Sequence, residues 1–218
     1  MTTEAFLIEA AIYSVLLPVG VGIWRFSNLE REAKLLLYML IPVAVNQCIA
    51  NWWLQHVSRN NIPFYHLYII IEIAFISWIY YSYLKKSRNV KLIPIITISF
   101  IALYLLSLIV NPGKLWRYST YERAIEAGIV LVFVGSYFIN IYKRQEIMHL
   151  HKASGFWIGF GLVLYFACNL TVFAFSELVF AQESSVFQSI WAIHAILTLL
   201  LYISFTIALT CRKTETTS

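Results

Sequence analysis

Aspartate is absent from this sequence, and all eleven acidic residues are glutamate. An intramembrane protease with a pair of catalytic aspartates is therefore excluded. Charged residues of either sign are scarce, at 12% of the 218 residues, whereas hydrophobic residues make up 60%. An average soluble domain has about 25% charged and roughly 45–50% apolar residues. The composition therefore indicates a protein whose solvent is lipid rather than water.

Motifs of common enzymes are also missing. The sequence has no H-E-x-x-H, G-x-S-x-G or P-loop pattern, and the neighbouring His149 and His151 fall in an expected loop. No lysine lies well inside an apolar run, which leaves no candidate for a retinal Schiff base. The three cysteines, Cys48, Cys168 and Cys211, lie within apolar runs, where small packing residues are more typical than disulfides or metal ligands. We expect no catalytic residues, no metal and no cofactor.

Seven apolar runs occupy almost the whole length of the chain. They cover residues 5–24, 34–55, 63–84, 91–111, 121–142, 153–177 and 186–211. A hydrocarbon layer about 30 Å thick needs about 20 apolar residues per helix, so each run is long enough to cross a membrane. The predicted fold class is all-α: a polytopic membrane protein with a single domain, residues 1–218, built as a seven-transmembrane-helix bundle. We expect no soluble domain and no cleaved signal peptide.

The basic residues divide unevenly between the two sets of connections. Twelve of the sixteen lie in one set: Arg25, Arg31, Lys34, Lys85, Lys86, Arg88, Lys91, Lys143, Arg144, Lys152, Arg212 and Lys213. The other set holds Arg59, Lys114, Arg117 and Arg123. Because basic residues favour the cytoplasmic side, the N-terminus is predicted outside and the C-terminus in the cytoplasm. The same scatter among helix ends, with no basic face, argues against a nucleic-acid partner despite the net charge of +5.

Six polar side chains from five predicted helices share one layer in the outer half of the bundle. They are Asn46, Asn51, Glu72, Glu126, Asn169 and His194. At 1.5 Å per residue, Glu72 and Glu126 reach roughly 8–14 Å below the outer surface. The inner halves of the predicted helices show no comparable polar set. An ionisable residue inside a span indicates function by default, so this layer predicts a pocket that opens toward the outside.

Aromatic residues accompany the polar ones at helical spacing. Tyr68 precedes Glu72 by four residues, Tyr165 precedes Asn169 by four, and Trp191 precedes His194 by three, so each pair shares a helix face. Aromatic walls with a few fixed polar groups are typical of a small-molecule site. The predicted ligand-binding residues are Tyr68, Glu72, Glu126, Tyr165, Asn169, Trp191, His194 and Asn51.

Purely structural explanations compete with this prediction. Amide, tyrosine and histidine side chains also hydrogen-bond between membrane helices and hold a bundle together. Glu126 is suited to a surface ion pair with Arg123 or to a place near a helix N-terminus. His194 is either a satisfied buried histidine or half of a proton-sensitive pair with Glu72. The G-x-x-x-G step at Gly155 favours close helix packing.

Several short segments carry a resemblance to a known family. They are Phe64–Glu72, Ile125–Ala127, Phe156–Gly159, Tyr165, and Ile190–Trp191 before His194. Together they resemble a family of short, largely uncharacterised bacterial seven-transmembrane proteins that are sensor-like and often encoded near histidine kinases. The resemblance implies a signalling role for Glu72, Glu126 and Trp191, and a place in the inner, cytoplasmic membrane. His194 stands where the family pattern implies asparagine.

The leading functional hypothesis is a receptor-like membrane sensor. It would bind a small or amphipathic ligand in the outer half of the bundle and act through a partner, a histidine kinase or another signalling protein, while surrounded by membrane lipids. One alternative is a small transporter or proton-coupled channel that uses Glu72 and His194 as relay groups. The other is an intramembrane lipid-modifying enzyme with the same two residues in acid–base or metal-binding roles.

Overall fold

The computed structural model describes residues 3–85, 87, 89–144, 150–174 and 184–211, and within these ranges it is built from helices without a strand. The helices are α1 (Thr3–Ser14), α2 (Leu16–Trp24), α3 (Arg31–His56), α4 (Ile62–Tyr83), α5 (Leu92–Val110), α6 (Thr120–Arg144), α7 (Ser154–Ala174) and α9 (Ser184–Thr210). Short 3₁₀ turns, η1 (Phe26–Asn28), η2 (Pro112–Trp116) and η3 (Leu150–Lys152), lie in the connections. The helices coincide with the predicted apolar runs to within three residues.

Six helical segments of the described chain are long and apolar enough to cross a membrane. A further apolar helix covers Ser154–Leu170. Large apolar side chains lie on the outside of the bundle as well as in its core: Ile98 is 67% exposed, whereas Leu36 and Ile73 are fully buried. Helices that are apolar on all faces are typical of membrane spans. The structure is therefore that of a polytopic helical membrane protein.

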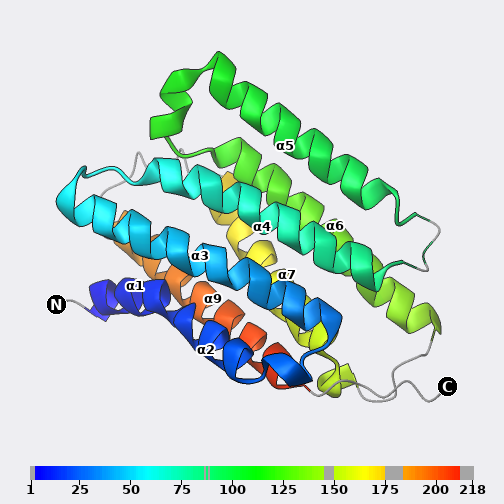
Figure 1. Cartoon of the computed structure of the whole chain (residues 1–218). Helices are drawn as coiled ribbons and strands as arrows, with labels where there is room; N and C mark the ends of the chain where they lie inside the picture. Colours follow the sequence, from blue (N-terminus) through cyan, green and yellow to red (C-terminus); the bar gives the residue numbers. More distant parts are fainter. Residues whose placement is uncertain (1–2, 86, 88, 145–149, 175–183, 212–218) are drawn as a thin grey trace.

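The first predicted span is broken into α1 and α2. Pro18 has no N–H to donate to the carbonyl of Ser14, which removes one helical hydrogen bond and bends the chain near Val15. At the same place, the hydroxyl of Ser14 donates to the carbonyl of Ala11 at 2.7 Å. Figure 1 shows the change of direction between the two helices. Both halves pack against α9, so the bend wraps the N-terminal segment around the last helix.

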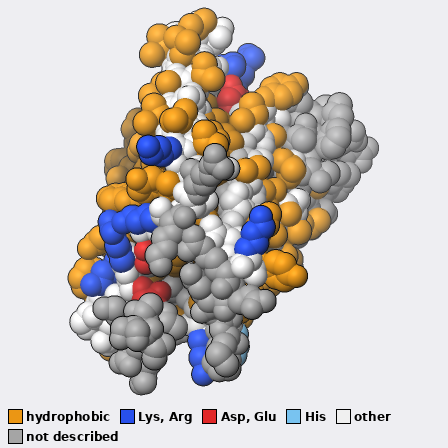
Figure 2. Space-filling view, turned by 90° about the vertical axis from the view of Figure 1, so that its right-hand side faces the viewer, with side chains coloured by type: hydrophobic (Ala, Val, Ile, Leu, Met, Phe, Trp, Pro, Cys, Tyr) orange, Lys and Arg blue, Asp and Glu red, His pale blue; other side chains and the backbone are white. Residues whose placement is uncertain are grey.

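Helices α1 and α2 run along the bundle in the same direction, and from α2 to α7 consecutive helices alternate in direction, which gives the bundle two ends (Figure 1). The end that holds connections 57–61 and 111–119 is called the first end here, and the end that holds connections 25–30 and 84–91 is called the second end. The described chain begins at the first end and finishes at the second. Figure 2, which looks onto the second end, shows Lys and Arg side chains around it and hydrophobic side chains along the flanks.

Helix α7 approaches two neighbours closely through its glycines. A Cβ on Gly159 would lie 2.8 Å from the ring of Phe138 on α6. A Cβ on Gly161 would lie 2.8 Å from the Cβ of Ser204 on α9. These positions tolerate no side chain without movement of a neighbour. The prediction that the glycine segment beginning at Gly155 serves close helix packing is confirmed.

Candidate ligand-binding site

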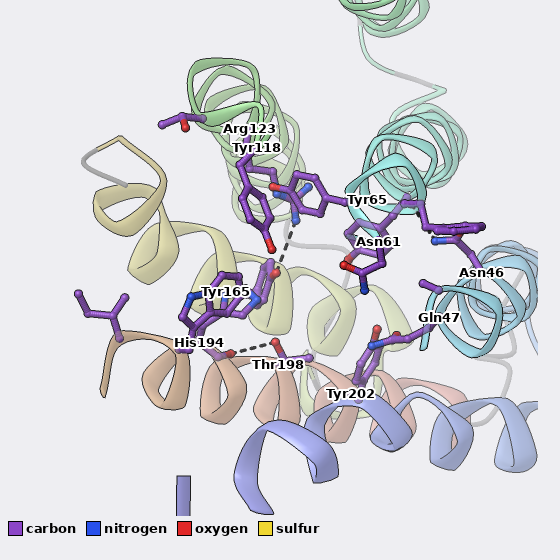
Figure 3. A pocket seen from close by; sticks show the side chains of 16 residues that line it. Asn46, Gln47, Asn61, Tyr65, Tyr118, Arg123, Tyr165, His194, Thr198 and Tyr202 are labelled. Atoms are coloured by element: carbon purple, nitrogen blue, oxygen red, sulfur yellow. Dashed lines mark hydrogen bonds between the residues drawn. The ribbon is translucent and has the colours of Figure 1, made fainter. Parts of the chain in front are cut away.

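A cavity of about 300 Å³ lies near the first end, where α3, α4, α6, α7 and α9 meet (Figure 3). Aromatic side chains make up much of its wall, among them Tyr65 and Tyr68 of α4, Tyr165 of α7, and Trp191 and Tyr202 of α9. Residues three or four apart on a helix share a face, which is how single helices contribute several side chains each. The result is an aromatic chamber rather than a solid core.

Polar groups interrupt this aromatic wall from three sides. Asn46 and Gln47 reach the cavity from α3, Arg123 from α6, and His194 and Thr198 from α9. Figure 3 shows these side chains converging from separate helices. The hydroxyl of Thr198 donates to the carbonyl of His194 at 2.9 Å and so remains tied to its own helix.

Three charged residues form a buried cluster at the cavity. One guanidinium nitrogen of Arg123, Nη1, donates to Oε2 of Glu72 at 2.5 Å and to Oε2 of Glu126 at 2.5 Å. The three side chains are at most 3% exposed. Tyr68 donates its hydroxyl to Oε1 of Glu72 at 2.6 Å, and Nη2 of Arg123 lies 3.5 Å from the hydroxyl oxygen of Tyr165. Helices α4, α6 and α7 are thereby joined by one polar network.

Aromatic rings surround the guanidinium of Arg123. Its central carbon lies 5.9 Å from the ring centroid of Tyr65, 5.4 Å from that of Tyr68 and 5.2 Å from that of Phe166. Ring faces carry partial negative charge and attract a cation. A planar guanidinium suits this place because it binds carboxylates at its edge while it stacks on rings with its face.

His194 is held in a defined orientation by Asn169. The amide nitrogen of Asn169 donates to the carbonyl of Tyr165 at 2.9 Å, so its Oδ1 is left to accept. Nδ1 of His194 lies 2.9 Å from that oxygen and must therefore carry the proton. The imidazole also packs edge-to-face against Trp191, with ring centroids 5.4 Å apart. Asn169 thus fixes the tautomer of a cavity-lining histidine.

The predicted residues fall into three groups in the structure. Tyr68, Tyr165, Trp191 and His194 line the cavity. Glu72, Glu126 and Asn169 lie behind the wall and hold Arg123 and His194 in place. Asn51 lies elsewhere: its amide donates to the hydroxyl of Tyr13 at 3.1 Å in exposed surroundings. Instead of Asn51, α3 contributes Asn46 and Gln47 from one turn earlier.

Arg123 is the main residue that sequence reasoning misplaced. It was counted among the basic residues at the helix ends, and its pair with Glu126 was considered as a surface contact. That interpretation is wrong, because Arg123 is only 1% exposed and Glu126 is fully buried. Two carboxylates predicted inside the membrane require a cation, and Arg123 lies three residues before Glu126 on the same helix face. These two observations indicate Arg123 as the cation that pairs with the buried carboxylates.

A second polar cluster at the first end has a structural character. His66 is buried, and its Nε2 donates to the carbonyl of Lys114 at 3.1 Å. Its Nδ1 then accepts from the hydroxyl of Tyr104 at 2.5 Å. Lys114 also pairs with Glu122 at 3.1 Å. Both ring nitrogens of His66 are satisfied, and the cluster ties α4 to α5 and η2.

The second end also carries buried polar contacts, which the sequence did not reveal. Ser154 donates to Glu30 at 2.9 Å and lies 3.1 Å from the hydroxyl of Tyr83. Ser82 donates to Glu32 at 2.6 Å. The inner halves of the helices therefore contain polar contacts that the sequence analysis does not predict. The contacts join α7 to Glu30 in the connection before α3, and α4 to Glu32 in the first turn of α3.

No family model, curated protein or solved structure matches this chain. The site is therefore interpreted from its own geometry. In the part of the chain that the structure describes, no three His, Cys or Glu side chains converge where they could hold a metal ion.

Proposed function

We propose that this chain is a receptor-like membrane sensor that binds a small or amphipathic ligand in the cavity at the first end. The observation that carries the proposal is the aromatic cavity with a buried charged cluster at its wall. Its volume of about 300 Å³ lies at the lower end of the range of small-molecule sites. Placing three charged side chains inside a bundle is costly, and such residues in membrane proteins mark functional sites.

The proposed orientation puts the cavity in the outer half of a bacterial inner membrane, with seven spans, the N-terminus outside and the C-terminus in the cytoplasm. Three observations support this. From α2 to α7 consecutive helices alternate in direction, and the described chain finishes at the opposite end from where it begins. Helix α7 has 21 residues, enough for a seventh span. Among the described residues, eight basic ones lie at the second end and four at the first, which supports a cytoplasmic second end; the eight are Arg25, Arg31, Lys34, Lys85, Lys91, Lys143, Arg144 and Lys152.

Cysteine labelling tests this orientation. In a background with all three cysteines changed to alanine, Arg117→Cys places a thiol at the first end and Lys85→Cys places one at the second. Both native side chains are exposed. A membrane-impermeant maleimide is expected to label the Arg117→Cys variant in intact cells and the Lys85→Cys variant after permeabilisation. The reverse pattern would refute the orientation.

Helix α9 is the proposed route from the ligand to the second end. It carries Trp191, His194 and Tyr202 into the cavity wall. Its 27 residues extend about 40 Å along the bundle. It packs against α7 and against both halves of the bent N-terminal segment, α1 and α2. A ligand that displaces Trp191 or His194 would move a helix that ends at Thr210, at the second end, where a partner such as a histidine kinase would receive the signal.

The proposal predicts a ligand-dependent movement at the second end. Spin labels on Cys211 and on a Lys85→Cys variant, with Cys48 and Cys168 changed to alanine, report the distance between the ends of α9 and α4. Three probes with one phenylmethyl body are added to the full chain in lipid nanodiscs: 2-phenylethylammonium, 2-phenylethanol and phenylacetate. At least one is expected to shift the distance by about 2 Å, the scale of helix displacements in signalling proteins.

A filled cavity provides the control. Ala50 lines the cavity, so Ala50→Trp should occupy it and abolish the shift. Ile98→Trp adds the same side chain at an exposed position of α5 and should leave the shift intact. If all three probes leave the distance unchanged at saturating concentrations, the sensor proposal fails.

The transporter alternative receives less support from the geometry. A carrier needs a polar route from the cavity to the second end. Along that direction the described core of α4, α6, α7 and α9 is mostly apolar, with buried side chains such as Ile76, Val134, Leu162 and Phe205. The buried polar side chains there, such as Ser77 and Ser204, are uncharged. The sensor remains the function that the site supports best.

A further inference from the structure

We infer that the cavity is a binding site for an organic cation, a ligand with an ammonium-type head on an apolar body. This inference rests on the proposed function and specifies its ligand. Three independent features carry it: the charge of the buried cluster, unpaired hydrogen-bond acceptors, and the aromatic wall.

With both carboxylates ionised, the buried cluster has an excess of one negative charge. Glu72 and Glu126 supply two carboxylates, and both bind the same nitrogen of Arg123, which supplies one positive charge. The side chains are at most 3% exposed, so water does little to screen the remaining charge. A buried charge without compensation is strongly unfavourable. A cation in the adjoining cavity would compensate it.

Two buried oxygen atoms around the cavity accept no hydrogen bond within the described structure. Asn46 is 8% exposed and lines the cavity, and its amide nitrogen already donates to the carbonyl of Phe64 at 3.0 Å. Its Oδ1 is left without a donor. Oε1 of Glu126, behind the wall, is likewise unpaired. Unsatisfied buried acceptors are costly, and a ligand in the cavity with an N–H group would satisfy the oxygen of Asn46.

The aromatic wall provides the surface that cations prefer. Tyr118 packs against Tyr65 with ring centroids 5.3 Å apart and against Trp191 at 6.1 Å, so three rings form a continuous wall from α4 to α9. Ring faces attract cationic ligands, most effectively where water is excluded. Burial raises the pKa of the Tyr118 phenol above its ordinary value, so that ring stays neutral. The apolar part of the ligand would pack against the same rings.

The geometry disfavours an anionic ligand. Arg123 is the guanidinium that an anion would seek, but two carboxylates already bind it. An anion would therefore approach a cluster that is negative overall. A proton on Glu126 would remove the excess charge just as a cation would, and the experiment must separate these two cases.

Calorimetric titration of the full chain in nanodiscs, with empty nanodiscs as the blank, compares the three phenylmethyl probes. 2-Phenylethylammonium is expected to bind at least tenfold more tightly than 2-phenylethanol, and phenylacetate is expected to bind most weakly. Glu126→Gln keeps the side-chain shape and neutralises the cluster, so it should lower the affinity for the cation at least tenfold without affecting 2-phenylethanol. Glu122→Gln, one turn earlier on α6 and paired with Lys114, is the matched control and should change neither affinity.

The remaining outcomes of these experiments test the organic-cation assignment and the sensor proposal separately. If 2-phenylethanol or phenylacetate binds as well as the cation and Glu126→Gln has no effect, the organic-cation assignment is overturned while the sensor proposal stands. If no probe binds between pH 6 and 8 and Glu126→Gln raises the melting temperature, a proton compensates the cluster and the assignment is overturned. If the cation binds as expected but no distance at the second end changes, the assignment holds and the sensor proposal fails.

Discussion

Replacement of Arg123 by methionine is expected to destabilise the bundle by about 3–5 kcal/mol, the cost of leaving buried carboxylates without their cation. Glu72 and Glu126 would remain in place with no guanidinium between them. Methionine preserves much of the arginine stem, whereas the contacts of the guanidinium with Tyr65, Tyr68 and Phe166 are lost together with the charge. The free energy of unfolding is measured by titration of the folded protein with SDS in mixed micelles.

A rescue experiment separates charge from packing. The triple variant Arg123→Met, Glu72→Gln, Glu126→Gln removes all three charges, and it should be more stable than Arg123→Met alone by at least about 2 kcal/mol, because a half-removed ionic cluster is worse than a neutral one. Arg117→Met, an exposed arginine at the same end of the bundle, should change stability by less than about 0.5 kcal/mol. Equal stability of the single and triple variants would contradict the electrostatic explanation.

The helices were predictable because the membrane imposes their length. Each span needs about 20 apolar residues, so each span appears in the sequence as an uninterrupted apolar run. The bend between α1 and α2 follows equally directly from Pro18. These features depend on local chemistry, not on which helix packs against which.

The depth of the polar side chains along each helix was predictable, but the direction in which each side chain points around its helix was not. A rise of 1.5 Å per residue fixes depth from sequence alone. Rotation is set by neighbouring helices, and Asn46 and Asn51 show the difference: five residues separate them by about 140° around α3. Asn46 consequently lines the cavity, while Asn51 contacts Tyr13.

Arg123 shows a second limit of reading a membrane sequence by position. Near the end of a span, a basic residue has two uses: it anchors the helix at the surface, or it reaches inward to a buried acid. A hydropathy profile does not distinguish a surface anchor from a basic residue that pairs with a buried acid. What distinguishes them here is Glu72, which lies on another helix, 51 residues away. Tertiary contact decides the role, so the charge of each predicted layer has to be balanced before basic residues are assigned to loops.

Substitution of Gly161 by leucine is expected to produce the second large effect, a loss of about 3 kcal/mol or more in stability. A Cβ at this position would lie 2.8 Å from the Cβ of Ser204 and 3.3 Å from Leu201, both on α9. A Cβ is attached to the backbone and cannot move aside as the tip of a long side chain can, so α7 and α9 must separate. Overpacking of a tight interface typically costs about 1–3 kcal/mol, and occasionally more.

Gly135 on α6 is the matched control for this prediction. A Cβ built there meets no atom within 4 Å, so Gly135→Leu should be neutral or slightly stabilising through its better helix propensity. Because Tyr165 and His194 line the cavity from α7 and α9, with ring centroids 5.6 Å apart, separation of the two helices should also weaken 2-phenylethylammonium binding. A Gly161→Leu variant with wild-type stability and affinity would show that α7 and α9 are not held together through this contact, and that the cavity wall does not depend on it.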